Sequence, residues 1–568
     1  MSNTYVNNDE IESVHIPRNY FYRGKKNLLS MEMGKIYPTY ASLLLPNDLL
    51  EIETDVVGRE LPTIKPSFSD KKVITRYFVV ACRNLDKNFY RFMTGYKEYS
   101  KQTKYEEPLK TWKPSKPDIT KPGELWDCLG YPTDCIPDDD SLPLAFWKDA
   151  YNYIYDTYFR YEPIQDSILV DGEPASSTNE VLLYVNKDKD YFTTMLPFQQ
   201  LGDPIALPLV GDAGVKFSYN VQTASNNPTI SSYAPAGQEN LGIVNQPYAY
   251  IPTSKSKGTD VSNKPLNLLA VDLSHVSSVM ISELRFAFAM QLFQEMQARG
   301  GIRDNEFLLM HFGVAPHDET LARPVYLGGF TSHFITSEIT QNSSTTSESP
   351  LGNIAGHGVV EGNSGQTIRY HAKEFCVLLG LSYIKTDNLY MNQGMPKEFS
   401  LKTPFDFPLP IFSHLSEQPV FARELLCASS QKLKKDYTKI ADDTTARDYN
   451  AKILGYRPVY DWARQTTDEV HGLFKSQQFY SDANTIEILY NLYNWTEAFQ
   501  FSIKDGERPL FNMDFLRSKY DNRNYSMVKI NGENSENQAN FLMWFNTKVN
   551  MWRPLSKLGT PGRIDHIL

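Results

Sequence analysis

The sequence contains few cysteines and no long apolar stretch. It has five cysteines in 568 residues, an odd number spread from Cys82 to Cys427, which does not indicate a disulfide framework. Cys128 and Cys135 have the only close spacing, and no histidine near them completes a zinc site. The longest apolar runs, such as residues 375–381, are far too short to cross a bilayer. We therefore expect a reducing compartment and no membrane insertion.

The first residues and the charge balance also argue against several classes of protein. Residues 1–10 have neither a basic region nor an apolar core, so no signal peptide is predicted and we expect a protein made and kept in a cytosol. The formal net charge of −10 argues against a surface coated with basic nucleic-acid-binding groups. A small basic cluster, Arg18 with residues 23–26, lies beside aromatic residues. It indicates a solvated arm, with a nucleic-acid contact as the alternative.

Catalytic motifs are missing as well. The Gly-rich residues 356–365 lack the Gly-Lys-Ser/Thr ending of a phosphate loop and favour a β-turn. No Gly-x-Ser-x-Gly elbow and no His-Glu-x-x-His pair is present. His311, His317 and Asp318 could ligate a metal, although isolated residues near a turn more often bond loop backbone. Residues 138–140, three aspartates, lack the alternating spacing of a calcium loop. We predict no catalytic residue, no cofactor and no metal site.

Aromatic residues are abundant. The chain has 35 tyrosines and 31 phenylalanines, while 41% hydrophobic and 22% charged residues are ordinary globular values. Aromatic side chains are favoured in surfaces buried between subunits, because they bring much area at low entropic cost. A large β-rich protein whose strands favour tyrosine and phenylalanine is the alternative. Both interpretations stay open at this point.

The pattern predicts a mainly β body with large insertions. Residues 73–80 and 367–384 are rich in β-branched, aromatic and alternating residues and predict strands. Prolines interrupt residues 190–209, and the polar residues 211–265 follow before an apolar run resumes at 266–273. Such an arrangement indicates a strand interrupted by a long excursion. The Lys- and Pro-rich residues 101–121 predict an extended, solvated segment.

Two helices are predicted inside the insertions. Apolar residues recur at three- and four-residue steps and indicate one aromatic stripe that packs in a core, namely Leu144, Trp147, Tyr151, Ile154, Tyr155 and Tyr158. A second helix is predicted over 278–299, with Ser277 as N-cap and Gly300-Gly301 as the left-handed stop. Its apolar face comprises Ile281, Leu284, Phe288, Leu292 and Met296.

Several motifs together resemble one family. Tyr191-Phe192-Thr193, Leu196-Pro197 and Leu207-Pro208-Leu209 are similar to the segment that precedes the largest surface insertion of microvirus major capsid proteins, in particular the gokushovirus branch. Further along, the same order of motifs is kept in His311-Phe-Gly-Val314, Arg323-Pro-Val-Tyr-Leu-Gly-Gly329, Asn392-Gln-Gly-Met-Pro396 and Gly559-Thr-Pro-Gly562. The chain departs from the family at Ala81-Cys82-Arg83, where a turn proline is usual. The resemblance covers residues 34–566.

The resemblance implies a fold and a role. It implies a single domain over residues 1–568, an eight-stranded antiparallel jelly-roll β-barrel with long loop insertions that contain several helices. It implies a structural capsid protein of the virion, assembled in the bacterial host cytoplasm into a T=1 icosahedral shell with five-, three- and two-fold contacts around a circular single-stranded DNA genome. An internal scaffolding protein, a small DNA-binding protein and a DNA pilot protein are further implied partners.

Residues 211–265 occupy the position of the insertion that projects at the three-fold axes in this family. Tyr219, Tyr233, Tyr248 and Tyr250, set among Asn, Ser and Gly, are typical of an adaptable binding surface, so we expect a contact with a bacterial surface receptor. A variable solubilising loop is the alternative. For the whole chain, the competing hypothesis is a glycan-binding protein or enzyme built on a jelly roll.

Overall fold

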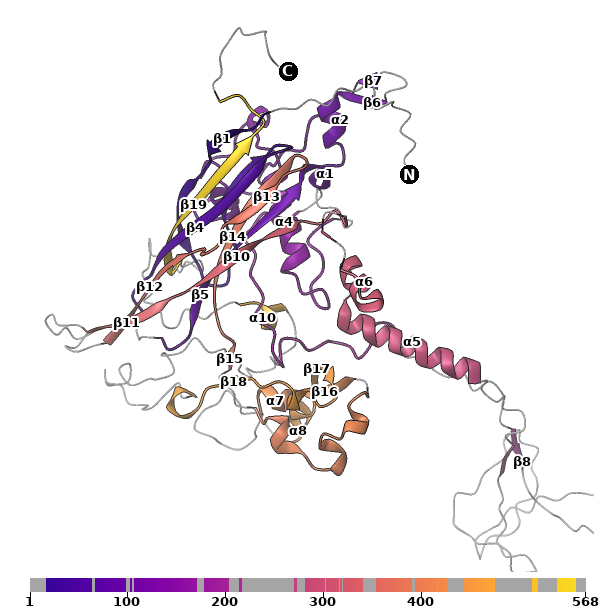
Figure 1. Cartoon of the computed structure of the whole chain (residues 1–568). Helices are drawn as coiled ribbons and strands as arrows, with labels where there is room; N and C mark the ends of the chain where they lie inside the picture. Colours follow the sequence, from indigo (N-terminus) through magenta and orange to yellow (C-terminus); the bar gives the residue numbers. More distant parts are fainter. Residues whose placement is uncertain are drawn as a thin grey trace, which may run out of the picture. The chain divides into compact units, whose positions relative to one another are not determined.

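The computed structural model divides the chain into two compact units, residues 1–201 with 295–568 and residues 202–294 (Figure 1). The described residues are 17–63, 67–98, 103–104, 107–170, 178–203, 214–216, 270–272, 281–301, 303–315, 317–318, 320–340, 354–390, 394–415, 417–427, 443–475, 513–518 and 539–557.

The larger unit contains a seven-stranded sheet. Its path runs β1-β19-β4-β12-β11, while β2 also pairs with β19 and β13 also pairs with β4. Every pairing is antiparallel. The strands are β1 (Asn19–Tyr22), β2 (Lys25–Met31), β4 (Leu49–Glu60), β11 (Ile335–Thr340), β12 (Ile354–Asn363), β13 (Ile368–His371) and β19 (Phe541–Arg553).

A second, four-stranded sheet has the order β10-β5-β14-β3 and is also antiparallel. Its strands are β3 (Tyr37–Leu44), β5 (Lys71–Ala81), β10 (Val325–His333) and β14 (Cys376–Thr386). β5 and β14 therefore confirm the strands predicted over 73–80 and within 367–384. In each sheet, strands that lie before residue 82 pair with strands that lie after residue 324.

Burial along the strands explains why some strands alternate in polarity whereas another is apolar over most of its length. β4 and β19 alternate between buried and exposed residues, because one face of their sheet is bare. β14 is buried at every residue, because its sheet is covered on both faces. The continuous apolar run of β14 is thus the signature of a strand in the middle of three layers.

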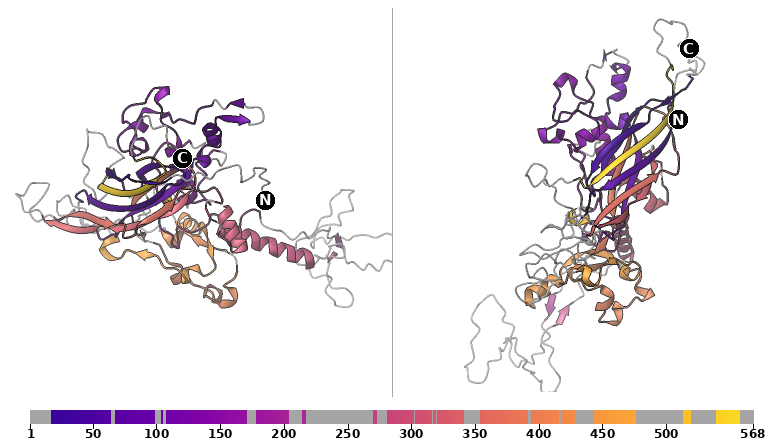
Figure 2. Two further views of the ribbon diagram at one scale, coloured as in Figure 1. Left: turned by 45° about the horizontal axis from the view of Figure 1, so that its top comes forward. Right: turned by 90° about the vertical axis from the view of Figure 1, so that its left-hand side faces the viewer.

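The two sheets pack face to face (Figure 2). Tyr77 of β5 bridges them: its hydroxyl lies 2.5 Å from the Thr54 hydroxyl of β4 and 3.3 Å from the Thr547 hydroxyl of β19. The predicted mainly-β body with helical insertions is confirmed. The predicted eight-stranded jelly-roll β-barrel is not confirmed as a barrel, because no described strand of the first sheet pairs with one of the second. Side-chain packing holds the sheets together, and each keeps its own edges.

α4 (Phe146–Tyr158) covers the outer face of the four-stranded sheet. Tyr151, Ile154 and Tyr155 are almost completely buried, so the predicted aromatic stripe is a core stripe. Next to it, Trp112 is 2% exposed and packs against Trp126, with ring centroids 4.9 Å apart. The insertion between β5 and β10 thereby forms a third layer over this sheet.

Shorter elements complete the larger unit. They are α1 (Cys82–Leu85), α2 (Phe89–Thr94), β6 (Tyr96–Glu98), β7 (Thr103–Lys104), α3 (Leu125–Cys128), α6 (Asp304–Phe312), β15 (Leu389–Tyr390), β16 (Glu417–Phe421), α7 (Ala422–Leu425), α8 (Asp443–Asn450), β17 (Ile453–Pro458), β18 (Asp468–Glu469) and α10 (Met513–Leu516). A separate apolar cluster joins the segment around Tyr191 and Phe192 to β15, α7 and α10.

The smaller unit contains the pair β8 (Gly214–Lys216) and β9 (Ala270–Asp272), which are antiparallel. It also contains most of α5 (Ile281–Gly300). The helix predicted over 278–299 is confirmed, and it ends where expected: Gly301 has φ +96°, and its amide donates to the Gln297 carbonyl. Ser277, the predicted N-cap, lies outside the described residues.

Candidate functional site

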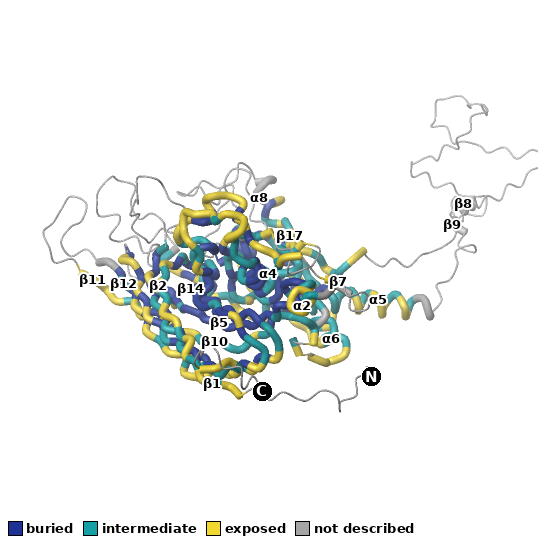
Figure 3. Tube along the Cα trace, turned by 90° about the horizontal axis from the view of Figure 1, so that it is seen from above, coloured by how far each residue is buried: buried dark blue, intermediate teal, exposed yellow. Residues whose placement is uncertain are grey.

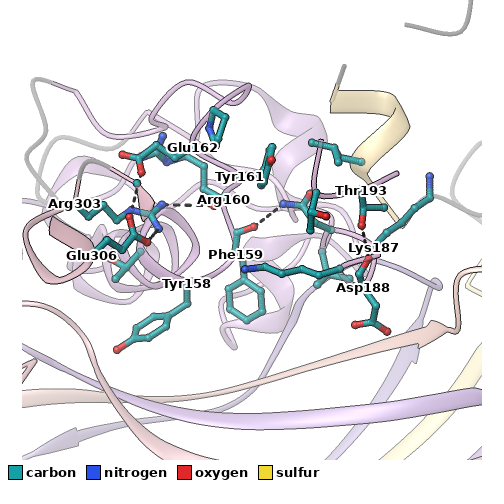
Figure 4. Close-up of a pocket in the computed structure, with 18 of the residues that line it drawn as sticks. Tyr158, Phe159, Arg160, Tyr161, Glu162, Lys187, Asp188, Thr193, Arg303 and Glu306 are labelled. Carbon is teal, nitrogen blue, oxygen red and sulfur yellow. Dashed lines mark hydrogen bonds and ion pairs between the residues drawn. The ribbon is translucent and has the colours of Figure 1, made fainter. Parts of the chain in front are cut away.

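A cavity of about 680 Å³ lies against the outer face of the four-stranded sheet (Figure 4). The sheet contributes Arg76 and Phe78 of β5, Tyr326 of β10 and Tyr383 of β14. The other walls come from residues 157–163 at the end of α4, residues 185–196, and residues 298–306 at the end of α5 and start of α6. All these residues belong to the larger unit. The cavity volume is typical of a small-molecule site.

Aromatic rings form the wall on the side of the sheet. Phe78 is the centre: its ring centroid lies 5.1 Å from that of Tyr158 and 5.4 Å from that of Tyr326. The Phe159 ring packs edge-on against Tyr383 at 5.7 Å. These contacts fix the end of α4 on the sheet and hold the wall rigid.

The charged residues of the lining are mostly cationic. Seven arginines and lysines line the cavity, against three carboxylates. The cations are Arg76, Arg160, Lys187, Lys189, Arg299, Arg303 and Arg323, and the carboxylates are Glu162, Asp188 and Glu306. In a chain of net charge −10, this is a local excess of the opposite sign.

Carboxylates partner three of these cations. Arg303 lies 3.4 Å from Glu306 and 3.9 Å from Glu162, and these three residues form one end of the cavity in Figure 4. The Arg160 Nε lies 3.0 Å from Asp156, and Arg299 pairs with Glu417. The positive charges of Arg160, Arg299 and Arg303 are therefore largely compensated by carboxylates within the fold.

Lys187 lies at the opposite end, near Asp188 and Thr193 (Figure 4). It is 8% exposed, donates to the Phe515 carbonyl, and its ammonium lies 4.9 Å from the centroid of the Phe515 ring. Burial lowers the pKa of Lys187 to about 7, because the charged form is poorly solvated there, while the nearby Asp190 acts in the opposite direction. An anion in the cavity would favour the charged form.

Arg76 and Arg323 are partnered differently. Arg76 donates to two hydroxyls, from Nε to Tyr383 at 3.2 Å and from Nη1 to Tyr326 at 3.4 Å. Arg323 lies over the ring of Tyr158 at 5.7 Å, and its buried Nη1 has no hydrogen-bond partner. Within the described part of the chain, neither guanidinium has a carboxylate within ion-pair distance.

The residues considered as metal ligands occupy ordinary loop roles. Asp318 accepts a hydrogen bond from the Tyr158 hydroxyl at 3.0 Å, His311 packs against Phe307, and the His317 carbonyl accepts from the backbone of the next turn. Asp139 forms an exposed ion pair with Lys113. Among the described residues, no group of three His, Cys, Asp or Glu is placed to hold a metal ion.

Large apolar side chains are exposed along residues 395–415, between β15 and β16. Phe399 is 75% exposed and Ile411 80% exposed, and five more residues of this apolar segment are exposed, namely Met395, Phe405, Phe407, Leu409 and Leu415. A monomeric protein rarely exposes so many large apolar side chains on one short stretch, which indicates a surface that another protein covers.

The bare face of the seven-stranded sheet has a similar patch. Leu28 of β2, Trp544 of β19 and Val57 of β4 are neighbours across the strands, and Leu28 is 81% exposed. With Leu542 they line a shallow groove. In the smaller unit, the apolar face predicted for α5 is exposed rather than buried at Phe288 and Leu292. Figure 3 shows exposed stretches along this helix.

The residues predicted to contact a host, Tyr219, Tyr233, Tyr248 and Tyr250, lie outside the described residues. The sequence interpretation missed the cavity, because its cations come from distant segments. One signal was present: Arg76 interrupts an apolar strand, and a charge in such a strand faces either a partner or a cavity. Searched over its described residues, the chain has no helix long and apolar enough to cross a membrane.

Comparison with known proteins assigns the chain to a family. The family model of the capsid protein (F protein) matches residues 9–562. The chain is 28% identical over 526 residues to the capsid protein VP1 of Bdellovibrio phage phiMH2K, covering 90% of this chain and 89% of that protein. It is 28% identical over 539 residues to VP1 of Chlamydia phage 1, covering 82% and 86% of the two chains. It is 25% identical over 574 residues to VP1 of Spiroplasma virus 4, covering 96% of each. The chain therefore belongs to the capsid protein (F protein) family, and it is a structural component of a phage virion rather than an enzyme.

Proposed function

We propose that this capsid protein folds as an eight-stranded jelly roll and assembles into a T=1 icosahedral shell around a circular single-stranded DNA genome. A jelly roll is a sandwich of two four-stranded sheets connected as two Greek keys. The strand orders β2-β19-β4-β12 and β3-β14-β5-β10 support it. In chain order the eight strands are β2, β3, β4, β5, β10, β12, β14 and β19. They lie, respectively, in the first, second, first, second, second, first, second and first sheet. That succession is the one a jelly roll requires.

One observation supports self-assembly, namely the exposure of large apolar side chains along the apolar segment 395–415. Isolated copies would leave Phe399 and Ile411 in water at 75% and 80% exposure. Burying a large apolar side chain contributes about 1.5–3 kcal/mol, and each copy in a closed shell would bury this surface at symmetry-related contacts. Assembly is therefore favoured over isolated copies that leave this surface in water.

The test is to replace Phe399→Ser and Ile411→Ser together and to follow particle formation by negative-stain microscopy and sedimentation. Loss of about 3 kcal/mol of burial per subunit contact lowers the association constant of that contact by about a hundredfold. We expect folded, unassembled chains with an unchanged thermal transition, because neither side chain contributes to the core.

Lys402→Ser is the matched control, since Lys402 is exposed in the same segment but carries a charge. It should assemble like the unmodified chain. Normal particle yield from the Phe399/Ile411 double variant would contradict the assignment of this segment to a subunit contact.

Host attachment is proposed for residues 211–265, on the composition around Tyr219, Tyr233, Tyr248 and Tyr250. Replacing the four tyrosines with serine should leave particle yield unchanged and reduce adsorption to host cells. Particles that adsorb normally after this change would exclude the tyrosines from receptor binding.

The proposed partners follow from the same role. They are further copies of the chain at five-, three- and two-fold contacts, the DNA genome, an internal scaffolding protein, a small DNA-binding protein, a DNA pilot protein and the host receptor. Since the chain is acidic overall, DNA contacts should be sparse and salt-sensitive, with lysine and arginine on phosphates and aromatic rings on bases. A DNA-filled particle that retains its genome contacts in molar salt would contradict this.

A further inference from the structure

We propose that the cavity over the four-stranded sheet is a binding site for a multivalent oxyanion, a phosphate-bearing small molecule held between Arg76 and Arg323. Shell formation is not required for this site, since every lining residue belongs to one chain.

The first argument is charge. Seven cations and three carboxylates line one concavity, and the carboxylates are already engaged: Glu162 and Glu306 by Arg303, and Asp188 by Lys385. Beyond the lining, Asp156 and Glu417 partner Arg160 and Arg299. Among the cations of the lining, Arg76, Arg323 and Lys189 then have no carboxylate within ion-pair distance in the described part of the chain, and they lie in a concave site where the surrounding protein strengthens the field.

The second argument is hydrogen-bonding capacity. Arg76 and Arg323 have no carboxylate partner among the described residues, and the buried Nη1 of Arg323 donates to nothing. A guanidinium offers five N–H groups in a planar fork that matches phosphate oxygens. Tyrosine hydroxyls satisfy only two of the donors of Arg76. The two forks therefore retain donors that a phosphate would accept.

The third argument is placement. Arg76 lies 5.6 Å from the centroid of the Tyr326 ring, and Arg323 lies 5.7 Å from that of Tyr158. Both rings pack on Phe78, at 5.4 and 5.1 Å, so one rigid aromatic wall carries both guanidinium groups. Lys189, exposed at residues 185–196 of the lining, adds a third cation without an ion pair among the described residues. A group fixed in this way loses little entropy on binding.

The positive charge of the cavity lining favours a phosphate over a single carboxylate as the ligand. A carboxylate carries one negative charge, whereas a phosphate monoester or pyrophosphate carries two or more and can accept from both arginines at once. The cavity of about 680 Å³ admits a nucleotide or a pyrophosphate. Aromatic side chains in the wall give an organic substituent an apolar surface beside the phosphate.

The test measures binding of inorganic pyrophosphate to the full-length chain by calorimetry and by the shift in melting temperature. Deoxyadenosine monophosphate and deoxyadenosine are measured in parallel, to separate the phosphate from the base. We expect pyrophosphate and the nucleotide to bind and to raise the melting temperature, and we expect the nucleoside to do neither. The double variant Arg76→Gln/Arg323→Gln should bind pyrophosphate at least about tenfold more weakly. Tenfold is the lower end of the loss of affinity expected when charge-assisted hydrogen bonds are removed.

Arg369→Gln is the matched control, since Arg369 pairs with Glu51 on the other sheet and is 73% exposed. It should bind pyrophosphate normally. Lys189→Gln is the second test variant if the double arginine variant does not fold, because Lys189 is exposed and its replacement should not disturb the fold. It should weaken pyrophosphate binding about threefold or more. Absence of binding at millimolar pyrophosphate, equal binding of deoxyadenosine, or unchanged affinity in the Lys189 and arginine variants would each overturn the proposal.

Discussion

Glu60 and Lys71 form a buried ion pair between the two sheets, and its removal is the sharpest test of the fold. Glu60 ends β4 in the seven-stranded sheet, and Lys71 begins β5 in the four-stranded sheet. Their side chains are both 0% exposed. Gly358 of β12 leaves the space for the carboxylate, since a Cβ there would lie 2.3 Å from Glu60 Oε2. The pair therefore lies in a site sealed from water.

Replacing Lys71→Met leaves the Glu60 carboxylate buried without its ammonium partner. Removing one member of a buried pair costs about 3–5 kcal/mol, because an uncompensated charge remains in a medium of low dielectric. Replacing both residues with methionine removes both charges and keeps the volume, so most of that loss should be recovered. The two single losses sum to about 6–10 kcal/mol and the double variant loses much less than either single one, so the coupling free energy between the two positions should exceed about 4 kcal/mol.

The assay is urea denaturation of the unassembled full-length chain, followed by tryptophan fluorescence, for the unmodified protein, the two single variants and the double variant. Arg369→Met provides the exposed comparison, at a cost of about 1 kcal/mol or less for a surface pair. Single variants that lose no more than this comparison, or a double variant less stable than either single one, would refute a sealed ion pair as the link between the sheets.

Three further predictions concern single residues. Tyr151→Phe removes a hydroxyl that donates to the Ile36 carbonyl and accepts from the Leu183 amide, each at 3.0 Å, and should cost about 1–3 kcal/mol of unfolding free energy in the same assay. Burial raises the pKa of Asp149 to about 6. Its unfolded pKa is about 3.9, so the folded chain binds more protons in this window and its stability falls as pH rises from about 4 to 6. Asp149→Asn should flatten that part of the stability profile, and a profile identical to that of the unmodified chain would contradict the assignment. Gly34→Ala should destabilise the chain strongly in a thermal melt, since φ is +88° and a Cβ would lie 1.8 Å from a backbone carbonyl oxygen; an unchanged transition would show that this turn adopts another conformation.

Much of the secondary structure could be predicted from local patterns. β5 and β14 are rich in β-branched and apolar residues over lengths typical of buried strands, and this needs no knowledge of their partners. α4 has apolar residues at helical spacing, and α5 ends at glycines that tolerate positive φ. The family motifs are likewise short and local. For α5 the pattern indicated a helix but not its environment, since Phe288 and Leu292 are exposed.

The sequence by itself determined several elements, the glycine stop of α5 and the family, because propensity, turn residues and motifs act over a few neighbouring residues. Only the tertiary structure decided that β2 and β19, more than five hundred residues apart, are neighbours, and that the two sheets pack face to face with no strand pairing between them among the described residues. It also brought Arg76, Lys187 and Arg323 to one cavity and sealed Lys71 against Glu60. Pairing register and the burial of charges depend on contacts between distant segments, and no local pattern specifies which segments meet.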